Sequence, residues 1–278
     1  MRAAVTVCLV PEAAQGPFVF HGATPEEALA RGCGRAAALG FDGVEVFPTG
    51  GEQLAGCDLD RHLSEHGLRV AAVGSGAGWV RHRLTLTHAE ARVRDEASAF
   101  VEGLVTVAAR HGAPVIVGSM QGRHEGSVSR ADALDLLAGA LARLGRHAAG
   151  SGQTLLYEPL NRYETNLFTR IGDAAAFLRE RRIDGVRILA DLFHMNIEEA
   201  DPAAALRACG PLLGHVHWAD SNRQAVGAGH TDAARIAAAL RDVGYDGWLS
   251  AEVFPIPDAD TAAARTIASV RAVAGGRA

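Results

Sequence analysis

Eight short apolar runs recur along the chain, and stretches with helical periodicity lie between most of them. We predict strands at residues 5–10, 43–47, 69–73, 114–118, 154–157, 186–190, 214–218 and 248–251. We predict helices at residues 25–39, 89–110, 130–149, 171–181, 203–209, 232–243 and 260–273. Strands that alternate with helices form parallel sheets, because each helix carries the chain back to the start of the next strand. Eight such strands favour a closed (β/α)8 TIM barrel, an α/β fold, over an open doubly wound sheet.

Length and composition agree with a single barrel domain that spans residues 1–278. The chain has 278 residues, of which 48% are hydrophobic, and one (β/α)8 barrel typically needs about 250 residues. No Pro/Ser-rich linker divides the pattern, and no G-x-G-x-x-G follows the first predicted strand. We therefore expect no nucleotide cofactor bound in a dinucleotide-type fold.

Charge, hydropathy and cysteine usage limit the partners and the compartment. The net charge of −5 gives no support for a nucleic-acid partner. No run approaches the ~18 apolar residues of a membrane helix, so we expect no membrane partner. The opening apolar segment is too short for a typical signal peptide. The four cysteines are scattered without C-x-x-C spacing, which favours a reduced cytoplasmic protein over a disulfide framework or a zinc site.

Four side chains that can bind a metal each stand at the end of a predicted strand. They are Glu158, Asp191, His217 and Glu252. Strand alternation makes each the last inward-facing residue of its run, with His215 expected to lie below His217 as a hydrogen-bonded residue. The carboxyl ends of parallel barrel strands converge on one point. Three carboxylates and one imidazole therefore predict a site for one divalent metal such as Mn²⁺, Mg²⁺ or Co²⁺.

Further polar residues lie in the loops that follow the predicted strands. Glu164, His194 and Arg223 each follow a candidate ligand within six residues, on the face where barrel enzymes bind substrates. Arg123, after the fourth predicted strand, is a candidate for binding the distal end of a substrate. From the residues alone, a solvated loop side chain or a surface ion pair explains each of them as well as a substrate role does.

Three long motifs resemble the signatures of a known family. They are Glu158-Pro-Leu-Asn-Arg-Tyr-Glu-Thr-Asn166, Ala190-Asp-Leu-Phe-His-Met-Asn-Ile-Glu-Glu199 and His215-Val-His-Trp-Ala-Asp-Ser-Asn-Arg223. Their order and spacing resemble the ketose 3-epimerase family, which includes D-tagatose and D-psicose 3-epimerases and belongs to the xylose-isomerase-like TIM barrels. Two further segments, Ala72-Val-Gly-Ser-Gly76 and Leu84-Thr-Leu-Thr-His88, are similar to the 5-keto-L-gluconate epimerase branch.

This resemblance implies a divalent-metal-dependent sugar epimerase that inverts the carbon next to a ketone. One Mn²⁺-like ion would be held by Glu158, Asp191, His217 and Glu252. Glu158 and Glu252 would also form the catalytic pair: one removes the proton next to the ketone, and the other returns a proton to the opposite face of the enediolate.

The resemblance also implies roles for the loop residues. Glu164, His194 and Arg223 would bind substrate oxygens near C1 and C2 of a small ketose or keto-sugar acid. Members of the family often form homodimers or homotetramers. Leu192 stands where a Thr usually follows the metal aspartate, and Trp218 adds bulk beside the metal histidine, so the exact sugar is left open.

Other functions stay open at this point. A proton-transfer aldose–ketose isomerase of the hydroxypyruvate-isomerase type could use the same two glutamates. A hydride-shift isomerase of the xylose-isomerase type would use a lysine, and all 27 basic residues of this chain are arginine. An abasic-site endonuclease-like metallohydrolase would need a zinc site richer in histidine and a basic face, which the net charge of −5 disfavours.

Overall fold

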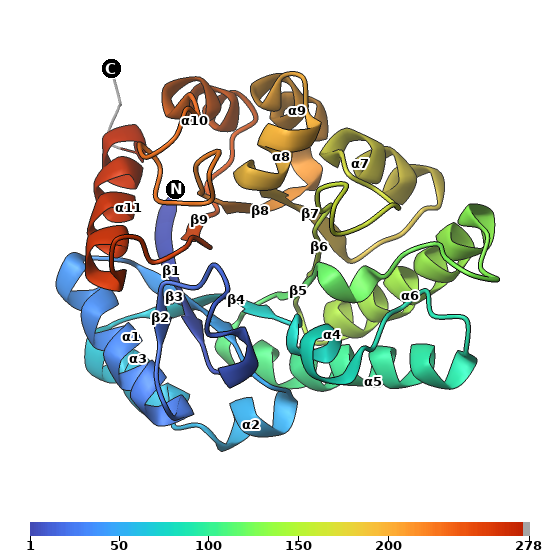
Figure 1. The fold of residues 1–278 in the computed structure, drawn as a ribbon, viewed down its shortest axis with the longest axis horizontal. Coiled ribbons are helices and arrows are strands. Elements are labelled where there is room, and N and C mark those ends of the chain that lie inside the picture. Colours follow the sequence, from blue (N-terminus) through green and yellow to red (C-terminus); the bar gives the residue numbers. More distant parts are fainter. Residues whose placement is uncertain (275–278) are drawn as a thin grey trace.

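The strands form one parallel sheet that closes on itself (Figure 1). The computed structural model describes residues 1–274, and residues 275–278 of the predicted domain lie outside the described residues. The strands are β1 Arg2–Cys8, β2 Phe20–His21, β3 Gly43–Phe47, β4 Arg69–Gly74, β5 Val115–Val117, β6 Leu155–Tyr157, β7 Val186–Asp191, β8 Leu213–His217 and β9 Trp248–Ala251. Their order is β2-β1-β3-β4-β5-β6-β7-β8-β9, and β1 also pairs with β9. Eight strands therefore close the predicted barrel, while the short β2 extends the sheet beside β1.

Helices surround this barrel (Figure 1). The α-helices are α1 Pro25–Leu39, α2 Gly51–Gly56, α3 Leu59–His66, α4 Ala77–His82, α5 Ala91–Ala108, α6 Arg130–Gly150, α7 Ile171–Glu180, α8 Leu192–Glu198, α9 Pro202–Cys209, α10 Ala233–Asp242 and α11 Ala259–Ala274. Short 3-10 helices are η1 Pro11–Ala13, η2 Ala109–His111, η3 Ser119–Gln121 and η4 Gly210–Leu212. The seven predicted helices are all present. The prediction missed α2, α3, α4 and α8, each of which has only six to eight residues.

The first strand differs most from its predicted bounds, since residues 5–10 were expected and β1 is Arg2–Cys8. Its early start follows from pairing with β9, where Arg2 lies opposite Trp248. Its early end follows from Pro11, which begins η1 with Val10 as the preceding cap residue. A proline has no backbone N–H to donate to a neighbouring strand, so the sheet pattern stops before it.

Side-chain caps define where several outer helices begin. Thr24, Ser129, Asp201 and Asp232 each accept a hydrogen bond from the backbone N–H three residues further along. Such caps satisfy N–H groups that have no partner within the helix, and each contributes about 1 kcal/mol. At the other end of α1, Gly40 takes a left-handed conformation with φ of 82°, which glycine adopts at little steric cost. The caps therefore fix where the loops of the barrel start and stop.

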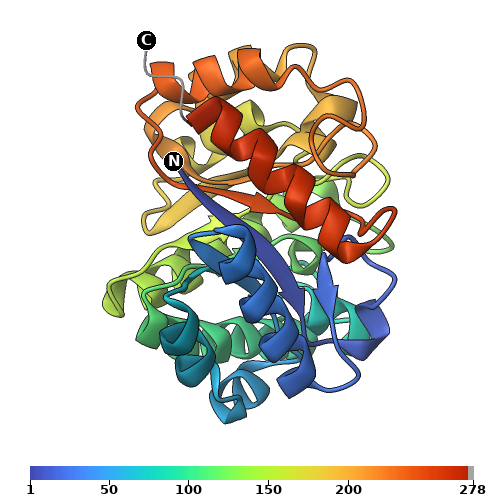
Figure 2. The same cartoon turned by 90° about the vertical axis from the view of Figure 1, so that its left-hand side faces the viewer.

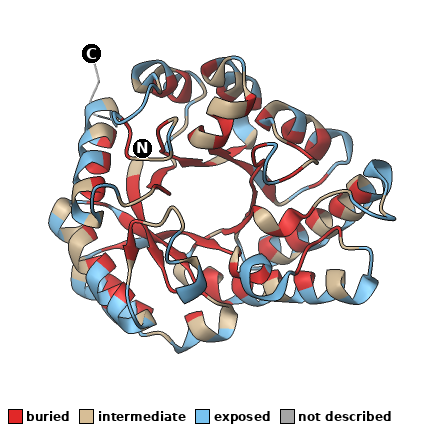
Figure 3. Ribbon diagram, in the orientation of Figure 1, coloured by how far each residue is buried: buried red, intermediate tan, exposed pale blue. Residues whose placement is uncertain are grey.

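The core lies between the sheet and the inward faces of the helices (Figure 3). Inside the barrel, Ala72, Ile116, Leu156 and Leu189 form a separate apolar cluster. None of the helices within residues 1–274 is long and apolar enough to cross a membrane.

The first strand and the last helix lie together on one side of the barrel (Figure 2). There β1 pairs with β9, and α11 packs against α1 and β1. This closure places the carboxyl ends of strands that are distant in sequence at the same rim of the barrel. A site can therefore be built from residues at the ends of several strands.

Candidate metal and substrate site

The four predicted metal ligands converge at the carboxyl ends of the strands. Glu158 and Glu252 directly follow β6 and β9, while Asp191 and His217 are the last residues of β7 and β8. Each offers one donor atom, and these atoms all lie within 4.8 Å of one another. His217 Nδ1 lies 3.4 Å from Glu158 Oε1, 3.4 Å from Asp191 Oδ2 and 3.5 Å from Glu252 Oε2. The structure thus brings the four predicted ligands together, with the three carboxylates around Nδ1 of His217.

This donor set fits a divalent ion. All four side chains are buried, and Glu158 Oε1 has no hydrogen-bond partner. A buried carboxylate oxygen without a partner is costly, so such atoms usually face an ion, water or ligand. Oxygen-rich sets with one imidazole suit Mn²⁺ or a similar hard cation.

The surroundings give the three carboxylates different proton affinities. Burial raises the pKa of Glu158 to about 7, and the nearby carboxylates of Glu252 and Asp191 add to the rise. Burial also raises the pKa of Glu252, although Arg223 opposes it. For Asp191, burial alone would raise the pKa, but His194 and Arg223 help to lower it below its ordinary range. The two glutamates are therefore suited to proton transfer, and the aspartate is suited to staying ionised.

Gly118 has no side chain, and the Glu158 carboxylate occupies the space that a side chain at this position would fill. A Cβ atom built on Gly118 would lie 2.4 Å from Glu158 Oε2. We expect Gly118→Ala to displace this carboxylate and weaken Mn²⁺ binding by about 10-fold or more, because overpacking typically costs about 1–3 kcal/mol. Gly139→Ala in α6 is the matched control, since nothing lies within 4 Å of its added Cβ. Isothermal titration with Mn²⁺ compares the two, and equal affinities would contradict this role.

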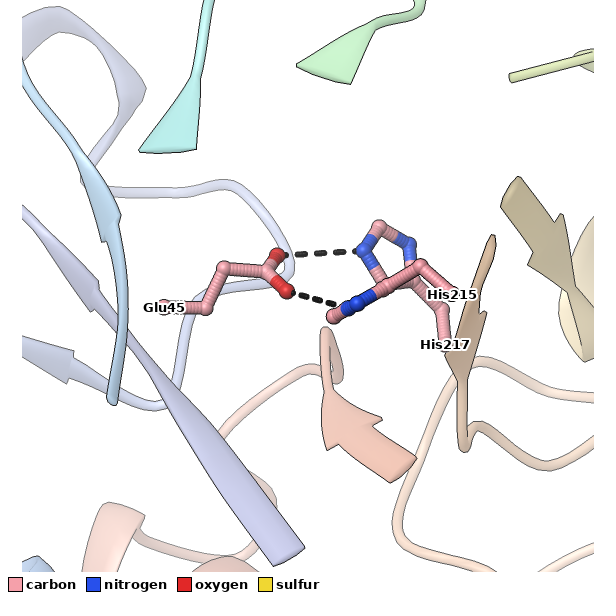
Figure 4. Close-up of side chains that lie close together, drawn as sticks. All are labelled: Glu45, His215 and His217. Atoms are coloured by element: carbon pink, nitrogen blue, oxygen red, sulfur yellow. Dashed lines mark hydrogen bonds and ion pairs between the residues drawn. The ribbon is translucent and has the colours of Figure 1, made fainter. Parts of the chain in front are cut away.

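Glu45 is a buried charged residue that the sequence analysis missed. It lies in β3 and is fully buried. Its Oε2 lies 2.7 Å from His215 Nε2, and its Oε1 lies 3.0 Å from His217 Nε2 (Figure 4). Burial alone would raise the pKa of Glu45, but His217 and His215 lower it below its ordinary range, so the carboxylate is ionised. The available signal was a charged residue in the middle of an apolar strand, Gly43-Val-Glu-Val-Phe47.

The carboxylates also control protonation of His217. Burial lowers the pKa of this imidazole, but Glu45 and Glu252 outweigh it and raise the pKa well above its ordinary value. A divalent ion at the cluster would compete with the proton on Nδ1, so ion binding would release a proton.

Arg223 joins the cluster from the loop after β8. Its Nη2 donates to Glu252 Oε2 at 2.5 Å and lies 3.7 Å from Asp191 Oδ2. The guanidinium carbon lies 4.8 Å from the centre of the Phe193 ring. Ion pairing and stacking hold the side chain in place, and its buried Nε has no hydrogen-bond partner.

Asp220 holds the loop that carries Arg223. Its carboxylate accepts hydrogen bonds from the backbone N–H groups of Ser221 (2.7 Å), Gly227 (2.7 Å) and Thr231 (3.0 Å). Burial would raise the pKa of Asp220, but these backbone donors lower it to about 2. The ionised carboxylate thus acts as the fixed centre of the loop, and the Asp220 carbonyl accepts from Arg223 N–H at 2.8 Å.

His194, which lies in α8 and not in the predicted loop, and Glu164 meet at Asn161, a residue of the first of the three motifs. Asn161 Nδ2 lies 2.8 Å from His194 Nδ1 and donates to Glu164 Oε1 at 2.9 Å. His194 Nε2 is buried without a hydrogen-bond partner, and lies 3.9 Å from Glu158 Oε1. The Glu164 side chain is 40% exposed. Asn161 therefore fixes the His194 ring through Nδ1, while Nε2 faces the donor cluster without a hydrogen-bond partner.

The fourth predicted loop residue, Arg123, lies apart from the donor cluster. It is half-buried, and its Nη1 donates to the carbonyl of Tyr163 at 3.5 Å. It lines the same cavity as Glu158 and Glu252.

That cavity has a volume of about 760 Å³, within the range of small-molecule sites. One part of its wall carries Glu158, Glu252, Glu164, His194 and Arg223. Another part is aromatic, with Phe18, Phe47 and Trp79. The Phe18 and Phe47 ring centres lie 4.4 Å apart, and a Cβ on Gly74 would lie 2.1 Å from the Phe47 ring. The cavity can therefore offer charge to one end of a ligand and an apolar surface to the other.

A closed β/α barrel with an acidic site at its carboxyl rim defines a class of barrel enzymes, and comparison with known families narrows the class. Residues 33–273 match the family described as the xylose isomerase-like TIM barrel. The chain belongs to this family, and the resemblance predicted from the motifs is confirmed.

Several relatives of known activity are similar to this chain. A D-psicose 3-epimerase from Agrobacterium fabrum is 29% identical over 227 residues, covering 79% of this chain and 77% of that protein. An L-ribulose 3-epimerase from Mesorhizobium japonicum is 29% identical over 85% of this chain and 79% of that protein. Among solved structures, a D-allulose 3-epimerase from Methylomonas sp. superposes with a TM-score of 0.82 at 23% identity, covering 98% of both chains, which shows the shared fold.

Proposed function

We propose that this protein is a divalent-metal-dependent epimerase that inverts the carbon next to the ketone of a ketose or keto-sugar acid. The observation that carries the proposal is the pair Glu158 and Glu252, two buried glutamates with raised pKa values in one four-donor cluster. They directly follow β6 and β9, so they enter the cavity from the ends of different strands. The names of the 3-epimerase relatives support the same reaction class.

Each glutamate would hold the ion and also move a proton. Glu158, Asp191, His217 and Glu252 would bind Mn²⁺, with Mg²⁺ or Co²⁺ as alternatives, and such an ion supplies Lewis-acid stabilisation of negative charge. One glutamate takes the proton from the carbon next to the ketone. The other gives a proton to the opposite face, which inverts the centre.

His194 of α8 and the loop residues Arg223 and Glu164 would place the substrate for this exchange. His194 Nε2 and Arg223 Nε are buried and without partners, so both can bind substrate oxygens. Arg223 also holds Glu252 by its 2.5 Å hydrogen bond, and Glu164 is exposed enough to reach a hydroxyl group. Fixing oxygens on both sides of the reacting carbon keeps that carbon within reach of the two glutamates.

A screen of free ketoses and keto-sugar acids in deuterium oxide with added Mn²⁺ tests the proposal. Deuterium at the inverted carbon next to the ketone is the expected result. Formation of an aldose labelled at C2, with deuterium at C1 of the recovered ketose, would instead indicate the hydroxypyruvate-type isomerase. An absence of exchange in every substrate of the screen would contradict both.

Arg123 provides a test of whether the substrate is an acid. If Arg123 binds a substrate carboxylate, Arg123→Ala should raise KM for the keto-sugar acid about 10-fold or more, since a hydrogen bond to a charged group contributes about 1.5–3 kcal/mol. The KM for a neutral ketose should change little. Arg92→Ala is the control for lost charge, because Arg92 pairs with Glu96 on the outer surface of α5. Equal shifts of KM for acid and neutral substrates would argue against carboxylate binding here.

A further inference from the structure

Glu45 stands outside the proposed donor set, yet it contacts one of its members. We propose that Glu45 is a positioning residue that fixes the tautomer of His217 and thereby sets the affinity of the site for a divalent ion. This inference rests on the proposed metal site. Glu45 does not touch the reacting atoms in this proposal and acts only through His217.

The first support is that the contacts of Glu45 with the two histidines are buried and join two different strands. Glu45, His215 and His217 are each 0% exposed. Glu45 belongs to β3 and the two histidines belong to β8, so the hydrogen bonds run between different strands through the barrel interior (Figure 4). A fully buried carboxylate is costly unless hydrogen bonds satisfy it, so this arrangement keeps both imidazoles in fixed orientations.

The second support is the direction of the two hydrogen bonds. An ionised carboxylate only accepts, so both histidines must present N–H groups at Nε2. A neutral imidazole carries one hydrogen, so an N–H at Nε2 leaves Nδ1 as a bare nitrogen with a lone pair. His217 Nδ1 is the atom that lies 3.4–3.5 Å from the three candidate carboxylate ligands. Glu45 therefore selects the form of His217 that can bind an ion at this cluster.

The alternative that Glu45, His215 and His217 form a second metal site fits the distances less well. These three residues can be grouped as possible donors, but Glu45 Oε2 and His215 Nε2 are 2.7 Å apart. Two ligand atoms that are each about 2.1 Å from one ion lie about 3 Å or more apart at angles of about 90° or wider. A separation of 2.7 Å is that of an N–H···O hydrogen bond.

Glu45→Gln is the direct test. The amide offers one acceptor oxygen in place of two and carries no charge, so it cannot hold both Nε2–H groups, and in either orientation it holds the Nε2–H form of His217 less strongly than an ionised carboxylate does. We expect Mn²⁺ affinity to fall about 10–100-fold, the usual effect of losing such a partner. Titration with Mn²⁺, followed by the electron paramagnetic resonance signal of the free ion, measures this without any assay of activity.

His215→Gln is the matched control. It changes the same buried cluster, but its amide N–H can still donate to Glu45 Oε2, which leaves the Glu45–His217 bond intact. We expect its Mn²⁺ affinity to stay within about 3-fold of wild type, well below the loss expected for Glu45→Gln. Wild-type affinity in Glu45→Gln, or an equal loss in both variants, would overturn the proposal. So would binding of two Mn²⁺ per chain with one lost in Glu45→Gln.

Nitrogen-15 NMR of the wild-type protein keeps the proposal testable even if Glu45→Gln does not fold. With diamagnetic Mg²⁺ bound, His217 should carry its hydrogen on Nε2, and a hydrogen on Nδ1 would overturn the proposal. A wild-type protein that binds no divalent ion would instead contradict the proposed function.

Discussion

Replacing Glu252 with Gln is expected to abolish epimerisation, with kcat falling at least about 10³-fold, within the range that a positioned acid–base group contributes. A glutamine has nearly the same shape and can still accept the hydrogen bond from Arg223. It can neither take up nor release a proton at neutral pH. The same result is expected for Glu158→Gln, because epimerisation needs one group to remove the proton and a second to return it.

The measurement is turnover at saturating Mn²⁺ and substrate, with exchange of the substrate proton followed in deuterium oxide. Mn²⁺ affinity is measured in parallel, because both glutamates are also proposed ligands. Glu180→Gln, at the exposed end of α7, controls for the loss of one negative charge. Turnover like that of the wild type in either Glu158→Gln or Glu252→Gln would refute the assignment of this pair.

The barrel and the donor cluster could be predicted because both depend on short-range regularities. Side chains alternate along a strand, so the last inward residue can be identified from a run of five or six residues. Parallel strands then bring such residues to one rim, whatever the length of the intervening helices. Glu158, Asp191, His217 and Glu252 follow this rule.

Glu45 did not follow from the same reasoning, because its role depends on how the barrel closes. It sits within β3 rather than at its end, and its partners lie 170 and 172 residues further along the chain. Only the closed arrangement of β1, β3, β8 and β9 brings a mid-strand carboxylate to the histidines.

The conformation of the loop that carries Arg223 also could not be predicted from the sequence. Arg223 adopts a left-handed backbone conformation with φ of 58°, which is uncommon for a residue other than glycine. The contacts of Asp220 and the contact between Arg223 and Glu252 support this backbone conformation.

The prediction missed helix α8 because Asp191 has two roles. Its Oδ1 caps the helix by accepting from Phe193 N–H, and its Oδ2 faces the donor cluster. A strand-end ligand that is also a helix cap leaves no loop between strand and helix.

Removing divalent ions with a chelator is expected to abolish activity, and adding Mn²⁺ should restore it. Three buried carboxylates within one cluster repel one another, so the ion should also stabilise the fold. At a concentration 100 times its Kd, a bound ion adds about 2.7 kcal/mol to stability. For a chain of this size that corresponds to a rise in Tm of roughly 5 °C. Thermal melts with and without Mn²⁺ measure this rise independently of activity.

Asp191→Asn separates the metal role of this residue from its helix-capping role. The asparagine oxygen can still cap α8 by accepting from Phe193 N–H, but it lacks the negative charge of a metal ligand. We expect the variant to fold, to lose most of the Mn²⁺-dependent rise in Tm, and to remain inactive when Mn²⁺ is restored. Asp201→Asn is the control, because Asp201 caps α9 by accepting from Ala204 N–H at 3.1 Å. It should keep the full Mn²⁺ response. Full turnover of the chelated wild type, or a wild-type Mn²⁺ response in Asp191→Asn, would show that this cluster is not the metal site.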